Sequence, residues 1–300
     1  MRDSLRAVRP LGVFLLACLT TVLAHTSSAN DSDAMVKLWT LPDTERTYLL
    51  ATPQNQQHEK PRPLLIMLHG GMGNARSFLD STGLVPLAVE ADWLVALPNG
   101  AAGPARSPDR RTWNAGLCCG RAARTNSKDQ LFIENMIDHI ATKQSIDRNQ
   151  IYVVGFSNGG MMAYSMACDA SSPVRAIAVV GASLVSETCS HPSSKVAIFA
   201  LHGDDDQSVP FAGGKGSRTR TRLHYRSVLD SLATFARPRK CKRTGPNLLP
   251  DGDRGWNWRC KAGAPIELRV FKQTGHRWPS SASAMIVDFF SRLNQSPKSH

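Results

Sequence analysis

Short apolar runs alternate with helical patterns along most of the chain. The predicted strands lie at residues 46–51, 63–68, 93–97, 151–156, 176–180, 196–201 and 266–271, and the predicted helices at 75–90, 128–142, 158–168, 218–236 and 282–293. Runs that are apolar throughout are typical of central strands covered on both faces. Their alternation with helices predicts an α/β fold with a mainly parallel sheet and helices on both faces.

The start of the chain has the pattern of an export signal. Three arginines within the first nine residues precede an apolar core at residues 11–24, and small residues at 27–29 follow as a cleavage site. The pattern predicts a signal peptide at residues 1–29, one domain at residues 30–300, and a secreted or periplasmic protein. No later apolar run is long enough to cross a bilayer, so no transmembrane segment is predicted in the mature chain.

Two other interpretations of this leader stay open. An uncleaved membrane anchor is disfavoured because the apolar run is short and a cleavage site follows it. A lipoprotein modified at Cys18 is disfavoured because Cys18 lies inside the apolar core and Leu16 fits a lipidation site poorly.

Beyond the leader the chain has six cysteines, namely Cys118, Cys119, Cys168, Cys189, Cys241 and Cys260. An even number in an exported chain indicates disulfide bonds. Cys241 and Cys260 flank a polar stretch with glycine and proline, which predicts a surface loop closed by a bridge worth roughly 3 kcal/mol. Cys168 and Cys189 flank a predicted strand, and their pairing would leave the neighbours Cys118 and Cys119, whose bridge would be unusual. These last two pairings stay open. No cysteine or histidine cluster has the spacing of zinc ligands, so we predict neither a metal nor a cofactor.

The positive charge is concentrated in one segment. The chain carries a net charge of +12, and residues 218–243 hold seven arginines and two lysines against one aspartate. Arg218, Arg222 and Arg226 recur every fourth residue, which aligns them on one face of the predicted helix. We favour a solvated helix face, and the alternative is attraction to anionic wall polymers, lipids or an acidic substrate. No reader motif or interleaved aromatic residue accompanies the charge, so nucleic acid is not a predicted partner.

The segment Gly155-Phe156-Ser157-Asn158-Gly159 matches the pattern G-x-S-x-G between a predicted strand and a predicted helix. In this setting the pattern is typical of a sharp turn that exposes a nucleophilic serine and directs helix amides at a developing oxyanion. The alternative is a glycine-rich turn in which Ser157 merely caps the helix.

A serine nucleophile requires a base and an acid that orients the base. His276 follows the last predicted strand, and three consecutive acids, Asp204, Asp205 and Asp206, follow strand 196–201. The order serine, aspartate, histidine is that of the α/β-hydrolases.

An oxyanion hole requires a second amide near the serine. A glycine turn, His69-Gly70-Gly71-Met72, ends the strand at 63–68. We therefore predict that the donors are the amide of Asn158 and the amide of either Gly71 or Met72.

Seven segments along nearly the whole mature chain match one family in order: RTYLL (46–50), LHGG (68–71), PNG (98–100), WNAGLCCG (113–120), GFSNGGMMAY (155–164), HGDDDQSVPF (202–211) and GHRWP (275–279). On these segments the chain resembles the exported polyhydroxybutyrate-depolymerase-like and feruloyl-esterase-like branch of the α/β-hydrolases. The resemblance implies Ser157 as nucleophile, His276 as base and Asp206 as acid. Position 204 departs from the family pattern, where threonine is usual, so Asp205 stays an alternative acid.

The resemblance also suggests three residues around the substrate. Trp113 and Asn114 would line the mouth of the site, and Trp278 would help to hold His276. A role as buried loop anchors is the alternative for each of them.

The size of substrate that the site can admit depends on whether a lid domain covers it. Large lids in this fold follow the strand that here ends near residue 182, and the next strand begins near residue 195. This connection is too short for a lid domain, and an open site suits a bulky or polymeric ester. The sequence thus predicts a secreted serine esterase for phenolic esters, such as feruloyl esters, or for short polyhydroxyalkanoate oligomers. The alternatives are a serine peptidase-like hydrolase and a catalytically silent binding protein of the same fold.

Overall fold

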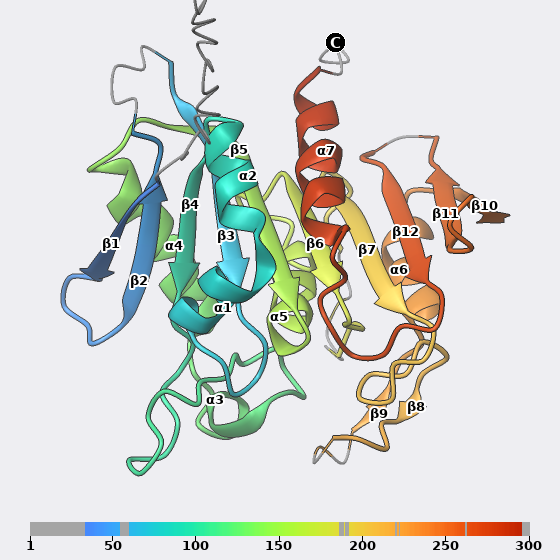
Figure 1. Ribbon diagram of the computed structural model, residues 1–300, viewed down its shortest axis with the longest axis horizontal. Helices are drawn as coiled ribbons and strands as arrows, with labels where there is room; N and C mark the ends of the chain where they lie inside the picture. Colours follow the sequence, from blue (N-terminus) through green and yellow to red (C-terminus); the bar gives the residue numbers. More distant parts are fainter. Residues whose placement is uncertain are drawn as a thin grey trace, which may run out of the picture. The chain divides into compact units, whose positions relative to one another are not determined.

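A ten-stranded sheet forms the centre of the fold (Figure 1). Its order is β1 (Met35–Thr40), β2 (Thr47–Thr52), β4 (Leu94–Pro98), β3 (Arg62–Leu68), β5 (Ile146–Phe156), β6 (Ala176–Val180), β7 (Ala197–Gly203), β12 (Ile266–Phe271), β11 (Arg254–Arg259) and β10 (Lys242–Leu248). Neighbours from β4 to β12 are parallel, whereas β1 and β2 at one edge and β11 and β10 at the other are antiparallel. The predicted, mainly parallel sheet is confirmed.

The computed structural model describes residues 34–54, 60–185, 189, 192–219, 221, 223–261 and 263–295. The predicted signal peptide, including Cys18, lies outside this part. One compact unit spans Ser32–His300. Within the described part, no helix is both long and apolar enough to cross a bilayer.

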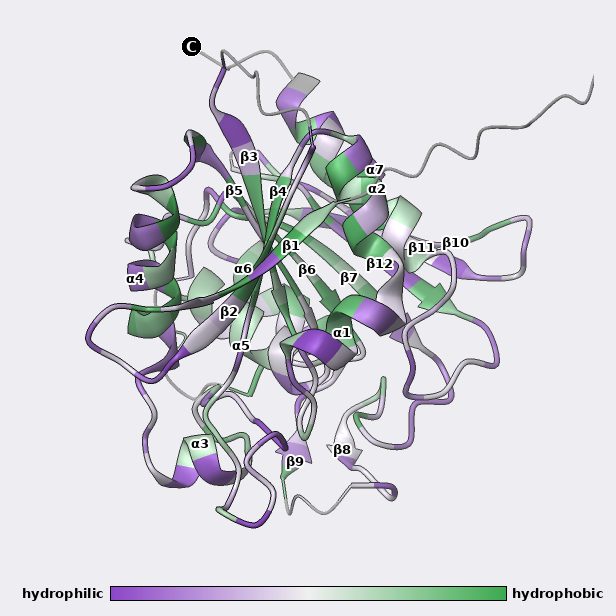
Figure 2. Ribbon diagram, turned by 60° about the vertical axis from the view of Figure 1, so that its left-hand side comes forward, coloured by the Kyte–Doolittle hydropathy of each residue, from purple (hydrophilic) through white to green (hydrophobic). Residues whose placement is uncertain are grey.

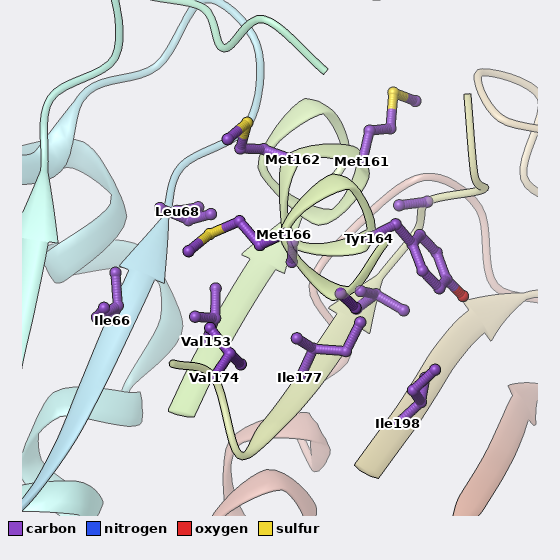
Figure 3. Close-up of a cluster of buried hydrophobic side chains, with 14 of the residues drawn as sticks. Ile66, Leu68, Val153, Met161, Met162, Tyr164, Met166, Val174, Ile177 and Ile198 are labelled. Atoms are coloured by element: carbon purple, nitrogen blue, oxygen red, sulfur yellow. The ribbon is translucent and has the colours of Figure 1, made fainter. Parts of the chain in front are cut away.

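Helices cover both faces of the sheet. One face packs against α1 (Ala75–Thr82), α2 (Leu84–Glu90) and α7 (Ala282–Gln295), and the other against α4 (Asp129–Ala141), α5 (Asn158–Ala167) and α6 (Val228–Ala236). The central strands are hydrophobic, and hydrophilic residues gather on the surrounding helices and loops (Figure 2). Under α5, a buried cluster joins the helix to β3, β5, β6 and β7 through residues that include Ile66, Val153, Met166, Ile177 and Ile198 (Figure 3).

The carboxyl ends of the parallel strands meet at one edge of the sheet. The short helix α3 (Gly120–Arg124) and the ribbon β8 (Gly214–Lys215) and β9 (His224–Tyr225) lie beyond this edge (Figure 1). Ligands of open α/β sheets bind outside the carboxyl ends of the strands, so these loops frame the candidate site.

The predicted helix at 218–236 is wrong in its first half. Helix α6 begins only at Val228, because the Ser227 hydroxyl accepts the Asp230 amide at 3.0 Å as an N-cap. The preceding arginines alternate with threonines, whose branched side chains disfavour helix. Arg218 and Arg226 therefore do not share a helix face, and Arg222 lies outside the described residues.

Two other predictions differ from the structure. The helix at 75–90 is divided into α1 and α2 by Gly83, which takes a left-handed conformation with φ of 63°. The segment between Cys241 and Cys260 is the hairpin β10–β11, which extends the sheet, and not a loop. Its polar, exposed first strand has no apolar run to reveal it.

The described cysteines form three bridges. Cys168 pairs with Cys189, Cys241 with Cys260 at the open end of the β10–β11 hairpin, and Cys118 with its neighbour Cys119. The first bridge ties the end of α5 to the segment between β6 and β7, so it fastens the helix that begins at Ser157.

Candidate active site

Ser157 lies on the turn between β5 and α5. Its backbone has φ of 52° and ψ of −120°, and its amide donates to the Val180 carbonyl at 2.8 Å. A positive φ is uncommon and costly for a residue with a side chain. The strained turn presents the Ser157 hydroxyl beyond the end of the strand, as in a nucleophile elbow.

Three glycines make room for this turn. A Cβ on Gly155 would lie 2.2 Å from the Gly159 carbonyl oxygen, and one on Gly159 would lie 2.1 Å from the Leu68 carbonyl oxygen. A Cβ on Gly160 would lie 2.7 Å from that of Ala182. The start of α5 therefore packs directly against the end of β3, which brings the His69-Gly70-Gly71 turn beside Ser157.

The structure brings Ser157, His276 and Asp206 together. The Nε2 atom of His276 lies 2.9 Å from the Ser157 Oγ, and its Nδ1 atom lies 2.7 Å from Oδ2 of Asp206. With the proton on Nδ1, His276 donates to Asp206 and accepts the Ser157 hydroxyl. The three groups come from the ends of β5, β7 and β12, so only the folded sheet makes them neighbours.

Asp206 is a buried carboxylate, and each of its oxygens accepts hydrogen bonds from the protein. Its Oδ1 accepts the amides of Ser208 and Val209, each at 2.8 Å. Burial by itself raises the pKa of Asp206, but the hydrogen bond and charge of His276 and the Val209 amide outweigh it, so the pKa is lowered. The group is therefore ionised at neutral pH.

The other two acids of this run face elsewhere. Asp204 pairs with Arg254 at 3.4 Å, and Asp205 is exposed, with Oδ1 accepting a weak hydrogen bond from Gln207. The Asp205 alternative is wrong in this geometry, because only Asp206 reaches His276.

His202 is a neighbour of the site that sequence reasoning missed. It is buried at the end of β7, with Nε2 donating to the Val209 carbonyl at 2.8 Å and lying 3.4 Å from Oδ2 of Asp206. Burial lowers its pKa, although the Asp206 charge acts in the opposite direction. A neutral His202 thus supports the loop that carries Asp206. Its place directly before the glycine that ends β7 was the available signal.

Asn158 and Gly71 line the same cavity as Ser157. Asn158 opens α5, and the first amides of a helix have no partner within it. A Cβ on Gly71 would lie 3.5 Å from that of Asn158, so the two residues adjoin. The Met72 amide instead donates to the Arg111 carbonyl at 2.8 Å. Of the two predicted alternatives, we therefore favour the amide of Gly71.

Trp113 is fully buried, so it fits the alternative of a buried loop anchor and not the predicted place at the site mouth. Its ring Nε1 donates to the His69 carbonyl at 2.9 Å. Its backbone amide donates to Oδ1 of Asn158 at 2.7 Å, and its carbonyl accepts Nδ2 of the same side chain at 3.0 Å. Trp113 therefore joins the turn that carries Gly71 to the start of α5, which carries Asn158.

Asn114 and Trp278 also lie away from the Ser157 cavity. Asn114 donates through Nδ2 to Asn126 and to the Ser127 carbonyl, in a separate polar cavity. Trp278 donates to the Ser283 hydroxyl at 3.1 Å and meets the Phe156 ring edge-on. Because the Phe156 ring lies 5.0 Å from His276, the tryptophan reaches the histidine only through Phe156.

The Ser157 hydroxyl opens into a cavity of about 940 Å³ between α3 and the β8–β9 ribbon. Its apolar wall includes Leu117, Met161, Leu223, Tyr225 and the Cys118–Cys119 bridge. The cavity has room for an acyl group the size of a substituted aromatic ring. Among the described residues, no group of three or more histidine, cysteine or acidic side chains is arranged to hold a metal ion.

Residues 54–224 match the sequence profile of the phospholipase/carboxylesterase family. The chain is 27% identical over 207 residues to a protein named probable feruloyl esterase C from Aspergillus flavus, covering 67% of this chain and 70% of that one. It is 25% identical over 236 residues to feruloyl esterase B of Piromyces equi, covering 77% of this chain but only 42% of that protein.

A solved structure of an acetyl xylan esterase from Aspergillus awamori has the same fold. It superposes with a TM-score of 0.58 at 15% identity, covering 86% of this chain and 99% of the esterase. This similarity concerns the fold alone.

Proposed function

The chain belongs to the phospholipase/carboxylesterase family of α/β-hydrolases, and we propose that this carboxylic-ester hydrolase is an exported serine esterase that works through an acyl-enzyme. The observation that carries the proposal is the hydrogen-bonded chain from Ser157 through His276 to Asp206, with contacts of 2.9 and 2.7 Å. The predicted signal peptide and the three cysteine pairs support export to an oxidising compartment.

Acylation follows from this geometry. As the Ser157 oxygen attacks the ester carbonyl, His276 takes its proton on Nε2, and the Asp206 carboxylate stabilises the imidazolium. The negative charge that develops on the carbonyl oxygen is stabilised by the amides of Asn158 and Gly71. His276 then returns the proton to the departing alcohol, which leaves the acyl group on Ser157.

Deacylation repeats these steps with water. His276 takes a proton from a water molecule, the hydroxide attacks the acyl carbonyl, and the same amides stabilise the second oxyanion. His276 finally protonates Ser157 as the acid leaves. Apart from the ester and water, these steps use only groups of this chain.

Two substrate classes fit the cavity. Feruloyl and related phenolic esters come first, because the curated relatives carry that name and the apolar wall around Leu117, Met161 and Leu223 suits an aromatic acyl group. Short hydroxyalkanoate oligomers are the second candidate, because their free terminal carboxylate suits the arginines on the cavity wall. A polymeric substrate is compatible with either.

Initial rates on methyl ferulate, p-nitrophenyl esters, hydroxybutyrate oligomers and peptide p-nitroanilides test the proposal. We expect hydrolysis of the esters and none of the anilides. Preference for the anilides would support a serine peptidase-like hydrolase, and a folded protein inactive on all of them would support the silent binding protein.

A further inference from the structure

Three arginines line the cavity that holds Ser157. Arg110 and Arg124 come from the segment that ends in α3, and Arg218 comes from the segment that carries β8 and β9. They therefore belong to the two segments between which the cavity lies. All three are exposed, and none forms a side-chain hydrogen bond or ion pair with another described residue.

Arginines outside the cavity vary in this respect, since Arg237, Arg243 and Arg259 also form no side-chain hydrogen bond or ion pair with another described residue. Other arginines of the chain have acids beside them: Arg46 pairs with Asp129 at 2.8 Å and Arg62 with Asp92 at 2.9 Å. The acid next to Arg110, Asp109, lies 3.7 Å from Arg111 instead.

No acidic side chain is found among the described residues that line the cavity. The nearest carboxylate of the site, Asp206, is buried behind His276 and accepts two amides as well as the histidine. Its charge is thus largely compensated. Unpaired cations around a recess with apolar walls produce a positive potential inside it.

We propose that this cavity selects esters that carry a second, anionic group, a carboxylate on either the acyl or the alcohol part, over neutral esters of equal length. The inference rests on the proposed esterase activity and names the substrate class for that same site. The apolar wall near Leu117 and Met161 takes the carbon chain or ring, and the guanidinium groups take the carboxylate.

Three kinds of ester offer this chemistry. The carboxylate lies on the alcohol part in a hydroxyalkanoate oligomer with a free acid end and in an ester attached to an acidic sugar, and it lies on the acyl part in a half-ester of a dicarboxylic acid. Two substrate pairs distinguish the positions. Mono-p-nitrophenyl glutarate against p-nitrophenyl valerate tests the acyl side, and hydroxybutyrate dimer against its methyl ester tests the alcohol side.

The experiment compares the ratio of kcat/KM for the anionic and the neutral member of each pair. The test variant combines Arg110→Gln, Arg124→Gln and Arg218→Gln. The matched control combines Arg237→Gln, Arg243→Gln and Arg259→Gln, which removes the same charge from exposed arginines that are not among the cavity-lining residues. Thermal unfolding of each variant checks its fold, and the three single cavity variants replace the triple if it does not fold.

We expect the ratio to fall about tenfold in the cavity variant, because each exposed charge pair contributes only a modest amount, and to stay unchanged in the control. For the wild type, raising NaCl from about 20 mM to about 0.5 M should lower the ratio several-fold, because salt screens exposed charges. A ratio that is equal in wild type and cavity variant, or that falls equally in the control, would overturn the inference. Activity on the neutral esters in that case would leave the esterase proposal standing, and no activity on any ester would reject the esterase proposal itself.

Discussion

At the scale of single residues, the site depends on which acid faces the histidine. Asp206 accepts hydrogen bonds from His276 and from two backbone amides, whereas Asp204 forms an ion pair with Arg254 on the surface. The three consecutive acids are chemically identical in sequence, and only their different hydrogen-bond partners separate them. The lowered pKa of Asp206 keeps it charged at the moment when His276 becomes an imidazolium.

Replacement of this acid by its amide should therefore be severe. We expect Asp206→Asn to lower kcat by roughly 10⁴-fold, because an amide neither holds the required tautomer of His276 nor stabilises its charge. The control Asp204→Asn should keep kcat within about twofold, because it breaks only an exposed ion pair. Kinetics on p-nitrophenyl butyrate measure both, and a larger loss in Asp204→Asn would mean that the acid is wrongly assigned.

At the scale of elements, the two amides that we propose for the oxyanion hole lie on separate segments. The turn after β3 carries Gly71, and α5 carries Asn158. Trp113 bonds to both segments, through the His69 carbonyl and through the Asn158 side chain. We therefore propose that Trp113 is a positioning residue for the oxyanion hole.

Removal of one bond from this anchor should affect catalysis more than binding. We expect Trp113→Phe to lower kcat about tenfold with little change in KM, because loss of a buried hydrogen bond loosens the oxyanion donors. Trp39→Phe is the matched control, because the Trp39 Nε1 has no hydrogen-bond partner among the described residues. A purely structural role for Trp113 would lower the melting temperature and leave kcat of the folded fraction unchanged.

His69 joins the same turn to the end of β4. Its Nδ1 donates to the Gly70 carbonyl and its Nε2 accepts the Gly100 amide at 3.0 Å, so the native state needs it neutral. Burial lowers the pKa of His69 to about 4, against a smaller opposite effect of the Gly70 carbonyl.

This shift gives a pH dependence of stability. The unfolded chain binds the proton near its ordinary pKa of about 6.5 and the folded chain only near 4, so the stabilisation is complete above about pH 6.5 and is lost as the pH falls toward 4. From pH 7 to pH 5 the free energy of unfolding should fall by about 2 kcal/mol more in wild type than in His69→Gln. Urea unfolding at both values measures the difference, and equal losses would show that His69 is not the titrating group.

Elements with continuous apolar runs could be predicted from the sequence, and those without could not. The predicted strands at 176–180 and 266–271 coincide with β6 and β12. Strand β6 is buried throughout, and β12 alternates buried residues with the partly exposed Glu267 and Arg269 before its buried end. Strand β10 was not predicted, because it is an exposed, polar strand at the edge of the sheet. The four-residue spacing of Arg218, Arg222 and Arg226 suggested a helix, but alternating threonines and the cap at Ser227 placed the helix start later.

The sequence likewise predicts some residues of the candidate site and not others. Ser157, His276 and the acidic run could be found because each follows a recognisable strand in the expected order. The cavity arginines Arg110 and Arg124 could not, because they lie on a long connection whose path over the sheet has no periodic signal. The sequence motif marks Trp113, but its predicted place at the site mouth is wrong, since the burial of a loop residue depends on contacts across the fold.

At the scale of the whole molecule, the charge has two roles to distinguish. Attraction of the mature protein to anionic surfaces through Arg218, Arg222 and Arg226 stays a prediction, and Arg218 also lines the Ser157 cavity. Co-sedimentation with vesicles of phosphatidylglycerol should decrease from low to high salt, because counterions screen exposed charges. If the protein does not co-sediment with these vesicles at low salt, the role of Arg218 is restricted to the cavity.

The central claim is that Ser157 is an activated nucleophile. Labelling with a fluorophosphonate probe, followed by mass spectrometry of the labelled peptide, tests it without knowledge of the substrate. We expect one probe molecule on Ser157 in wild type, no label in a folded Ser157→Ala variant, and greatly slowed labelling in His276→Ala, since the serine and its base act as a unit. Label on another residue, or equal labelling of wild type and the folded Ser157→Ala variant, would contradict it.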